Sequence, residues 1–208
     1  MKAFQSVPIP ALMKNLPKDK RGYPIPHTVI TKDGVAHFTV NDEARRQRSI
    51  AEDKCPICNR KLFRFRASIG GPLSALHPHG AFIDPPMHVE CAQYALQVCP
   101  YLALPSYIKR IDAGTLKDEI ITIDQTMDPR KPDLFLMVVH RDQRYVFWDG
   151  TMLVRYIKPT KPYVRIEYWN HSKQIPNDEG EQIARAVLQK QLEADYEHLL
   201  KEAEATEG

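Results

Sequence analysis

Four potential metal ligands, spaced as two pairs, constrain this chain more than any other feature of its sequence. The first pair is Cys55 and Cys58 and the second is His88 and Cys91, with two residues inside each pair and 29 between the pairs. Zinc takes four thiolate or imidazole ligands in a tetrahedron, so this Cys3His set would fill a site with no open position. The sequence therefore predicts a structural Zn²⁺ ion.

The residues around each pair favour a treble-clef-like unit. Pro56 stiffens the Cys-x-x-Cys turn, and Asn59 just after it tolerates a left-handed backbone. Asp84 is a candidate helix cap, and the prolines at 85 and 86 suit a first turn, where no amide partner is needed. Residues three apart share a helix face. We therefore expect a knuckle, then a β-hairpin, then a helix carrying His88 and Cys91.

Three further side chains compete as ligands. Cys99 ends the predicted helix, and we expect it to be a small buried apolar residue. His77 or His79 is an alternative to His88, but the loop between the pairs offers no helix to fix its direction. The alternative to a metal site is a pair of buried thiols beside a surface histidine.

Composition limits the class of protein. A chain of 208 residues is one large domain or two small ones, and its formal charge of +3 does not dictate a nucleic-acid partner. Three of the four cysteines are used by the proposed site, which favours a metal and a reducing compartment over disulfides. No apolar run reaches the roughly 20 residues of a membrane span, and no signal-peptide core is visible. We expect a cytoplasmic protein without membrane contact.

The predicted fold class is α+β, in four regions. Residues 1–26 form a proline-rich arm that packs on the core or recognises a partner; packing is favoured because Leu16, Tyr23 and Ile25 are apolar anchors. Residues 27–53 hold a hairpin (28–31 and 35–40, turning at 32–34) and a short helix capped at 41–42. The treble-clef-like zinc unit is 54–105, and residues 106–208 form an antiparallel sheet plus a C-terminal helix. Two arrangements fit this order: one core shared with the rest, or a separate core.

Alternating and apolar runs define the expected elements of that last region. We expect a strand at 119–123, a hairpin of 134–140 with 144–148, and strands at 152–157 and 163–169. Residues 178–205 are typical of a helix, with an apolar stripe at Ile183, Val187, Leu192, Tyr196, Leu199 and Leu200.

Charge is distributed unevenly. Residues 45–66 hold eight basic and two acidic side chains, whereas residues 178–208 hold nine acidic and three basic ones. Phe63 and Phe65 alternate with basic residues, as in a phosphate-binding face with stacking aromatics. The alternative is that both rings lie in the core on one strand face. The candidate nucleic-acid-binding residues are Arg45, Arg46, Arg48, Arg60, Lys61, Arg64 and Arg66.

Five short runs of residues stand out in the first half of the chain: Arg-Gly-Tyr-Pro-Ile-Pro at 21–26, Cys-Pro-Ile-Cys at 55–58, Gly-Gly-Pro at 70–72, Pro-Pro-Met-His-Val-Glu-Cys-Ala at 85–92 and Val-Cys-Pro-Tyr-Leu at 98–102. With these runs the chain resembles a family of uncharacterised proteins from bacteriophages and actinobacteria. The resemblance covers roughly residues 16–105, and Asn59 stands where the family often has glycine. It implies an intracellular, zinc-binding protein encoded by a phage or prophage, and no particular activity.

Three functions fit these observations. The first is a non-catalytic zinc module that binds nucleic acid through the basic residues. The second is a module that binds a host or phage protein through the arm or the acidic helix. The third is a metal-dependent nuclease using His77, His79 and Asp84, but its usual motifs are missing, as are a phosphate loop and a Gly-x-Ser-x-Gly elbow. The sequence favours a binding protein over an enzyme and leaves the oligomeric state open.

Overall fold

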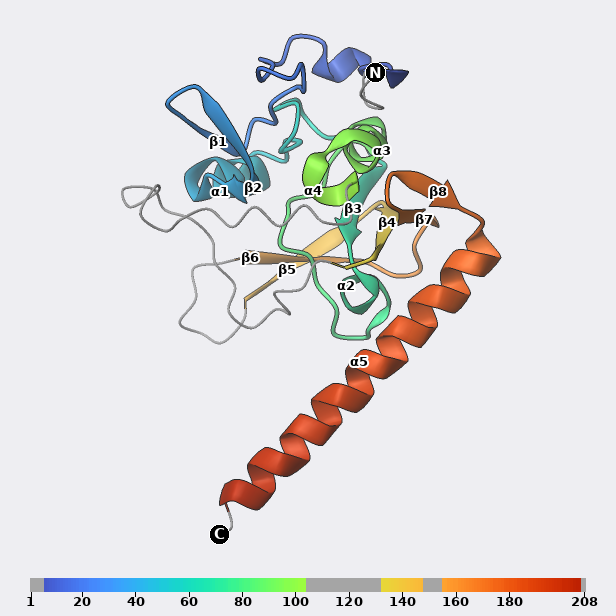
Figure 1. The fold of residues 1–208 in the computed structure, drawn as a ribbon. Helices are drawn as coiled ribbons and strands as arrows, with labels where there is room; N and C mark the ends of the chain where they lie inside the picture. Colours follow the sequence, from blue (N-terminus) through green and yellow to red (C-terminus); the bar gives the residue numbers. More distant parts are fainter. Residues whose placement is uncertain (1–5, 104–131, 148–154, 207–208) are drawn as a thin grey trace.

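The computed structural model describes residues 6–103, 132–147 and 155–206 (Figure 1). Its helices are η2 (Ala11–Met13), α1 (Glu43–Ala51), α2 (Pro72–Leu76), α3 (Val89–Val98), α4 (Pro100–Ala103) and α5 (Asn177–Thr206). Its strands are β1 (Val29–Lys32), β2 (Val35–Asn41), β3 (Arg66–Gly70), β4 (Leu134–His140), β5 (Gln143–Phe147), β6 (Arg155–Pro159), β7 (Arg165–Asn170) and β8 (Lys173–Ile175). The protein is therefore a mixture of helices and antiparallel sheets that ends in a long helix, as the sequence predicted.

A four-stranded antiparallel sheet, in the order β3-β4-β7-β8, lies at the centre of the fold. Strand β4 is buried along its whole length, and its side chains alternate between two hydrophobic clusters. Phe135, Met137 and Val139 pack with the region of the four predicted metal ligands. Leu134 and Leu136 pack on the opposite face with residues of α2 and α5. The region 54–105 thus shares one sheet with the C-terminal region.

The predicted hairpin between 134–140 and 144–148 is wrong. Strand β4 pairs with β3 and β7, while β5 pairs with β6 in a separate two-stranded sheet. The reason lies in the side chains: an apolar strand buried on both faces takes a central position with a partner on each edge. Of the other predicted strands, 119–123 lies outside the described residues and 152–157 does so in part.

The N-terminal elements agree with the sequence prediction. Strands β1 and β2 form a hairpin whose turn residues Asp33 and Gly34 have φ angles of 51° and 73°, as a type I′ turn requires. Helix α1 is capped by Asp42, which accepts a hydrogen bond from the Arg45 amide at 2.9 Å. The arm before the hairpin packs on the core, since Leu16 and Tyr23 pack against the hydrophobic cluster that includes the three predicted cysteine ligands.

Helix α5 runs from Asn177 to Thr206, close to its predicted extent, and its first turns pack against α2 and β7. Gly180 allows this approach, because a Cβ there would lie 2.3 Å from Tyr168 Cβ. Further along, the helix stands away from the rest of the molecule (Figure 1), and Leu192 and Tyr196 are exposed. The predicted apolar stripe is therefore only partly covered by the described residues, because the helix extends past the sheet.

Candidate metal centre

The first ligand pair lies on a tight turn. The Cys55 amide donates to the Arg60 carbonyl oxygen at 2.9 Å, and the Asn59 amide donates to the Cys55 carbonyl oxygen at 2.8 Å. Asn59 has a φ of 58°, the left-handed conformation that the sequence predicted for it. A short bridge between Lys54 and Lys61 closes the turn. These bonds fix the backbone so that Cys55 and Cys58 present their sulfur atoms to the same point.

The second pair comes from the start of α3. His88 is the N-cap residue and Cys91 lies in the first turn, so the two side chains share one side of the helix end. The predicted capping role of Asp84 is wrong: the helix begins later, and Asp84 accepts a hydrogen bond from Asn41 Nδ2 at 2.8 Å. Two hydrogen bonds between Ala67 and Met87, of 2.8 and 2.9 Å, hold the helix start beside β3.

The four predicted ligands meet in one buried group. The ligand atoms of Cys55, Cys58, His88 and Cys91 all lie within 4.8 Å of one another. Nδ1 of His88 is 3.3 Å from Cys58 Sγ and 4.0 Å from Cys91 Sγ. Tetrahedral zinc with bonds of about 2.3 Å to sulfur and 2.0 Å to nitrogen places such atoms about 3.5–3.8 Å apart. The group can hold a metal ion with little movement.

A hydrogen bond orients the histidine for this role. His88 Nε2 lies 2.9 Å from the carbonyl oxygen of Lys61, which can only accept, so Nε2 carries the hydrogen. Nδ1 then faces the sulfur atoms, and it is the nitrogen that a metal ion would bind in place of a proton. Metal-binding histidines commonly use their second nitrogen in this way. The Phe63 ring covers the imidazole from outside, with centroids 4.5 Å apart.

The electrostatics of the group favour a bound cation. Burial opposes a charged imidazole, but hydrogen bonds to Cys55 and Cys58 outweigh this effect and raise the pKa of His88 to about 10. Hydrogen bonds with Cys55 and Cys91 hold the pKa of the Cys58 thiol far below its usual range, whereas hydrogen bonds with Cys55 and Cys58, together with burial, raise the pKa of Cys91. Three sulfur atoms this close cannot all be thiolates unless positive charge is present.

The competing ligands lie elsewhere. Cys99 is the C-cap residue of α3 and is partly exposed, which differs from the buried position predicted for it. His77 and His79 lie beyond α2 with their ring centroids 5.6 Å apart, and neither joins the group. Among the described residues, the Cys3His group is the one cluster of three or more potential ligand side chains.

The structure separates the predicted basic residues into buried and exposed sets. Arg46 is 0% exposed, and its guanidinium donates to the Ile83 carbonyl oxygen at 2.9 Å and to Glu43 at 3.0 Å. Its predicted role in binding nucleic acid is therefore wrong, because helix α1 turns it inward. Arg66 is mostly buried and pairs with Asp53 at 2.7 Å. The side chains that are exposed or largely so are Arg45, Arg48, Arg60, Lys61 and Arg64.

The alternative in which Phe63 and Phe65 lie in the core is wrong. They are 58% and 42% exposed, because strand β3 begins only at Arg66 and the alternation before it forms no strand. The guanidinium of Arg64 lies 6.0 Å from the Phe65 ring centroid, and that of Arg141 lies 5.5 Å from it. Sequence reasoning missed Arg141, since only the antiparallel pairing of β3 with β4 brings it here.

No protein-family model matches this chain, and none of the curated proteins or solved structures with which it was compared matches it either. Within the described ranges, no helix has the length and apolar character needed to cross a membrane.

Proposed function

We propose that the Cys3His group binds a structural Zn²⁺ ion in a treble-clef-like unit. Thiolate-rich sets with one imidazole suit zinc, and four protein ligands leave no position for a substrate or a reactive water. The order of a knuckle, the short Ala67–Met87 pairing and a helix start supports the treble-clef comparison.

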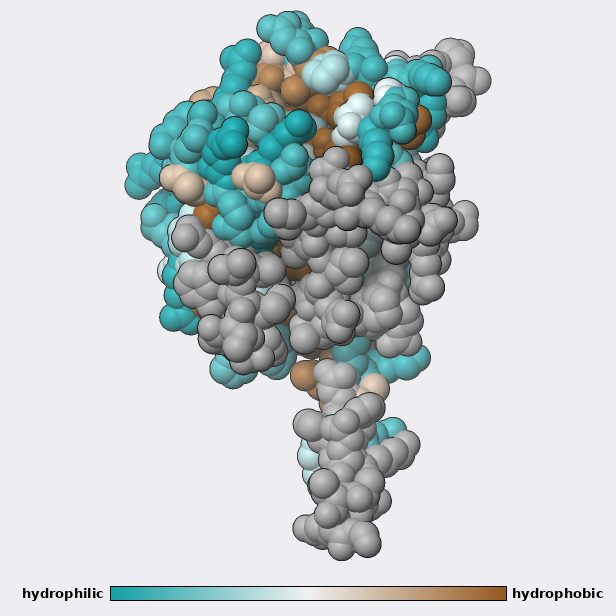
Figure 2. Space-filling view, turned by 90° about the vertical axis from the view of Figure 1, so that its left-hand side faces the viewer, coloured by the Kyte–Doolittle hydropathy of each residue, from teal (hydrophilic) through white to brown (hydrophobic). Residues whose placement is uncertain are grey.

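We further propose that this unit binds nucleic acid, and that the protein acts in the cytoplasm, that of the host for a phage or prophage protein. The observation that carries the proposal is the exposed surface beside the metal centre, formed by Phe63, Phe65, Arg60, Lys61 and Arg64. In proteins that bind single strands, exposed aromatic rings stack on unpaired bases, and the cations beside them bind the phosphates. In Figure 2, which views the side carrying β1, β2 and α1, most of the coloured side chains are hydrophilic.

Fluorescence anisotropy with labelled single-stranded and duplex DNA and RNA, at two salt concentrations, tests this function. We expect affinity to fall steeply with salt. The double variant Arg60→Gln/Arg64→Gln should reduce the slope of log affinity against log salt by about 1.4–1.8 if both side chains contact phosphates. The matched control is Arg185→Gln/Lys190→Gln on α5, which removes the same charge elsewhere and should leave the slope unchanged.

Aromatic stacking has its own test. Phe65→Ala should weaken binding to single strands by about 1–3 kcal/mol, the usual contribution of one stacked base. Tyr196→Ala, which truncates another exposed aromatic residue on α5, is the control. Absence of binding at low salt, or equal losses in the two variants, would argue against a nucleic-acid site on this surface.

A second candidate function is binding of a host or phage protein. The specific observation is that Leu192 and Tyr196 are exposed on the part of α5 that stands away from the molecule (Figure 1). A Leu192→Glu/Tyr196→Glu variant should then lose a partner that wild-type protein retains in pull-downs. Nuclease activity receives no comparable support, because His77, His79 and Asp84 belong to no cluster of three potential ligands in the described residues.

A further inference from the structure

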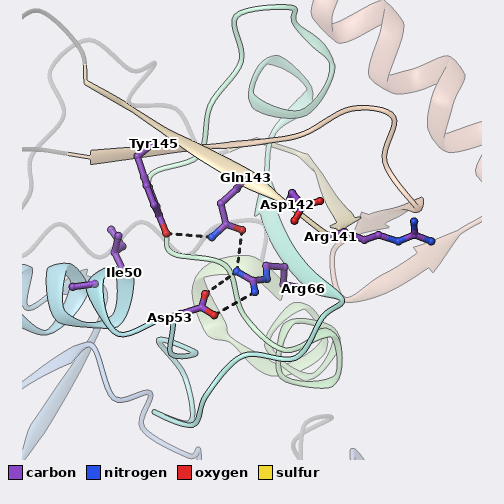
Figure 3. A pocket seen from close by; sticks show the side chains of 8 residues that line it. Ile50, Asp53, Arg66, Arg141, Asp142, Gln143 and Tyr145 are labelled. Carbon is purple, nitrogen blue, oxygen red and sulfur yellow. Dashed lines mark hydrogen bonds and ion pairs between the residues drawn. The ribbon is translucent and has the colours of Figure 1, made fainter.

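A pocket opens between the end of helix α1 and strand β5, next to the proposed nucleic-acid surface. It is a cavity of about 450 Å³, within the range of about 300–1,000 Å³ that small-molecule sites occupy. Ile50 and Tyr145 supply apolar wall, and Asp53, Arg66 and Gln143 supply polar groups (Figure 3). These residues come from three distant parts of the chain and meet only in the folded protein.

A chain of hydrogen bonds presents a fixed polar edge in this pocket. Asp53 binds both terminal nitrogens of Arg66, at 2.7 and 3.3 Å. Arg66 Nη1 donates to Gln143 Oε1 at 3.4 Å, and Gln143 Nε2 donates to the Tyr145 hydroxyl at 3.3 Å (Figure 3). The amide orientation of Gln143 is thereby set, yet one N–H and one lone pair remain for a ligand. The edge therefore offers a donor and an acceptor side by side.

The charges of the pocket favour a neutral ligand over a phosphate. Two carboxylates, of Asp53 and Asp142, and two guanidiniums, of Arg66 and Arg141, line it. The Arg66 charge is already matched by Asp53, and the Arg141 side chain points away from the cluster in Figure 3. A flat polar ring with hydrogen-bonding edges suits this balance better than an anion does.

Arg141 borders both the pocket and the exposed aromatic surface. Arg141 lines the pocket and also lies 5.5 Å from the ring centroid of Phe65, which is itself next to Arg66 in the chain. A polynucleotide lying over Phe65 and Arg64 would thus reach the pocket mouth within a short distance. Its phosphates would stay with the exposed cations outside.

We propose that this pocket receives one unpaired base of a single-stranded nucleic acid and reads its edge with Gln143. The ring of the base lies against Tyr145 and Ile50, while the Gln143 amide forms paired hydrogen bonds, as glutamine does with adenine. This inference rests on the proposed nucleic-acid function and adds selection of single strands and of base type. A duplex cannot fill the pocket without flipping a base out.

The test measures affinity for short labelled homopolymers of each base, as single strands and as duplexes, for wild-type protein and Gln143→Leu. We expect wild type to prefer single strands and to favour one base by about fivefold or more, the usual discrimination of a paired contact. Gln143→Leu should equalise the four bases without changing the salt slope. Gln174→Leu, at an exposed glutamine on β8, is the matched control and should retain the preference.

Each outcome separates the two proposals. Salt-dependent binding with equal affinity for all four bases, or a preference that survives in Gln143→Leu, overturns the pocket and keeps the nucleic-acid function. Absence of salt-dependent binding overturns both. Nucleoside monophosphates added as competitors distinguish a base within a strand from a free nucleotide: displacement by the monophosphate alone identifies a mononucleotide site instead. If Gln143→Leu does not fold, Gln143→Glu, which replaces the amide donor by a negatively charged acceptor oxygen, must change the order of preference among bases.

Discussion

Replacing Cys55 by serine is the sharpest perturbation of the proposed zinc centre. Cys55 is 0% exposed, and its backbone bonds to Arg60 and Asn59 do not depend on the side chain. Serine is similar in size, so the change removes one thiolate ligand with little effect on packing. Any large loss of stability then reports on the metal.

The expected magnitude follows from the energetics of closed zinc sites. Structural zinc contributes roughly 10–16 kcal/mol of folding free energy in finger peptides, which is roughly 2.5–4 kcal/mol for each of four ligands. A buried hydroxyl without a partner costs about 1–3 kcal/mol more. A loss of about 3 kcal/mol alone lowers the melting temperature of a chain this long by roughly 6–12 °C.

The assay combines thermal unfolding with elemental analysis of the purified protein. Wild type should contain one zinc per chain, and a chelator should lower its melting temperature towards that of Cys55→Ser while leaving the variant almost unchanged. Cys99→Ser, a cysteine outside the group, is the control and should shift melting by only a few degrees. A Cys55→Ser protein that keeps one zinc per chain and melts like wild type would refute the assignment.

Three further expectations concern the fold. Burial lowers the pKa of His140 to about 4, against 6.5 in an unfolded chain. Between pH 4 and pH 6.5 the unfolded state therefore binds more protons than the folded state. The free energy of unfolding should fall by up to about 3 kcal/mol as the pH drops from 6.5 to 4. Urea midpoints across this range should show a shallower pH dependence in His140→Gln. Gly180→Ala should lower stability by about 1–3 kcal/mol through its clash with Tyr168, and an unchanged melting temperature would contradict the close approach. Arg46→Met should cost about 3 kcal/mol by removing the buried guanidinium that pairs with Glu43 and binds the Ile83 carbonyl, yet leave nucleic-acid affinity as it is.

The features that the sequence predicted well depend on short-range chemistry. Asp33-Gly34 fits a turn that needs two positive φ angles, Asp42 caps the helix that directly follows it, and Asn59 adopts a left-handed backbone within its own knuckle. The metal group belongs here too, although its pairs are far apart, because each pair is positioned by local structure. One turn and one helix start, which together carry four suitable metal ligands, are enough to predict that the two pairs meet in the fold.

The features that the sequence did not predict depend on residues that are far apart along the chain. Strand β4 was expected to turn back on the next strand, but its uniformly apolar sequence requires cover on both faces and partners on both edges. Phe63 and Phe65 follow the strand period, yet they come just after the turn of Cys55 and Cys58, and strand β3 starts only at Arg66. The pocket of Arg66, Gln143 and Tyr145 joins segments about 77 residues apart, and no local pattern records that meeting.

The metal centre and the proposed binding surface are connected by the residues that lie between them. The carbonyl of Lys61 holds His88 in position, while the Lys61 side chain points into solvent at 72% exposure. The Phe63 ring packs at a tilt against the same imidazole, and Phe63 is still 58% exposed. The backbone that closes the metal site also carries these exposed side chains. The ion would therefore hold the binding surface in place without touching the nucleic acid. A zinc ion with no open position can in this way be essential for binding while taking no part in chemistry.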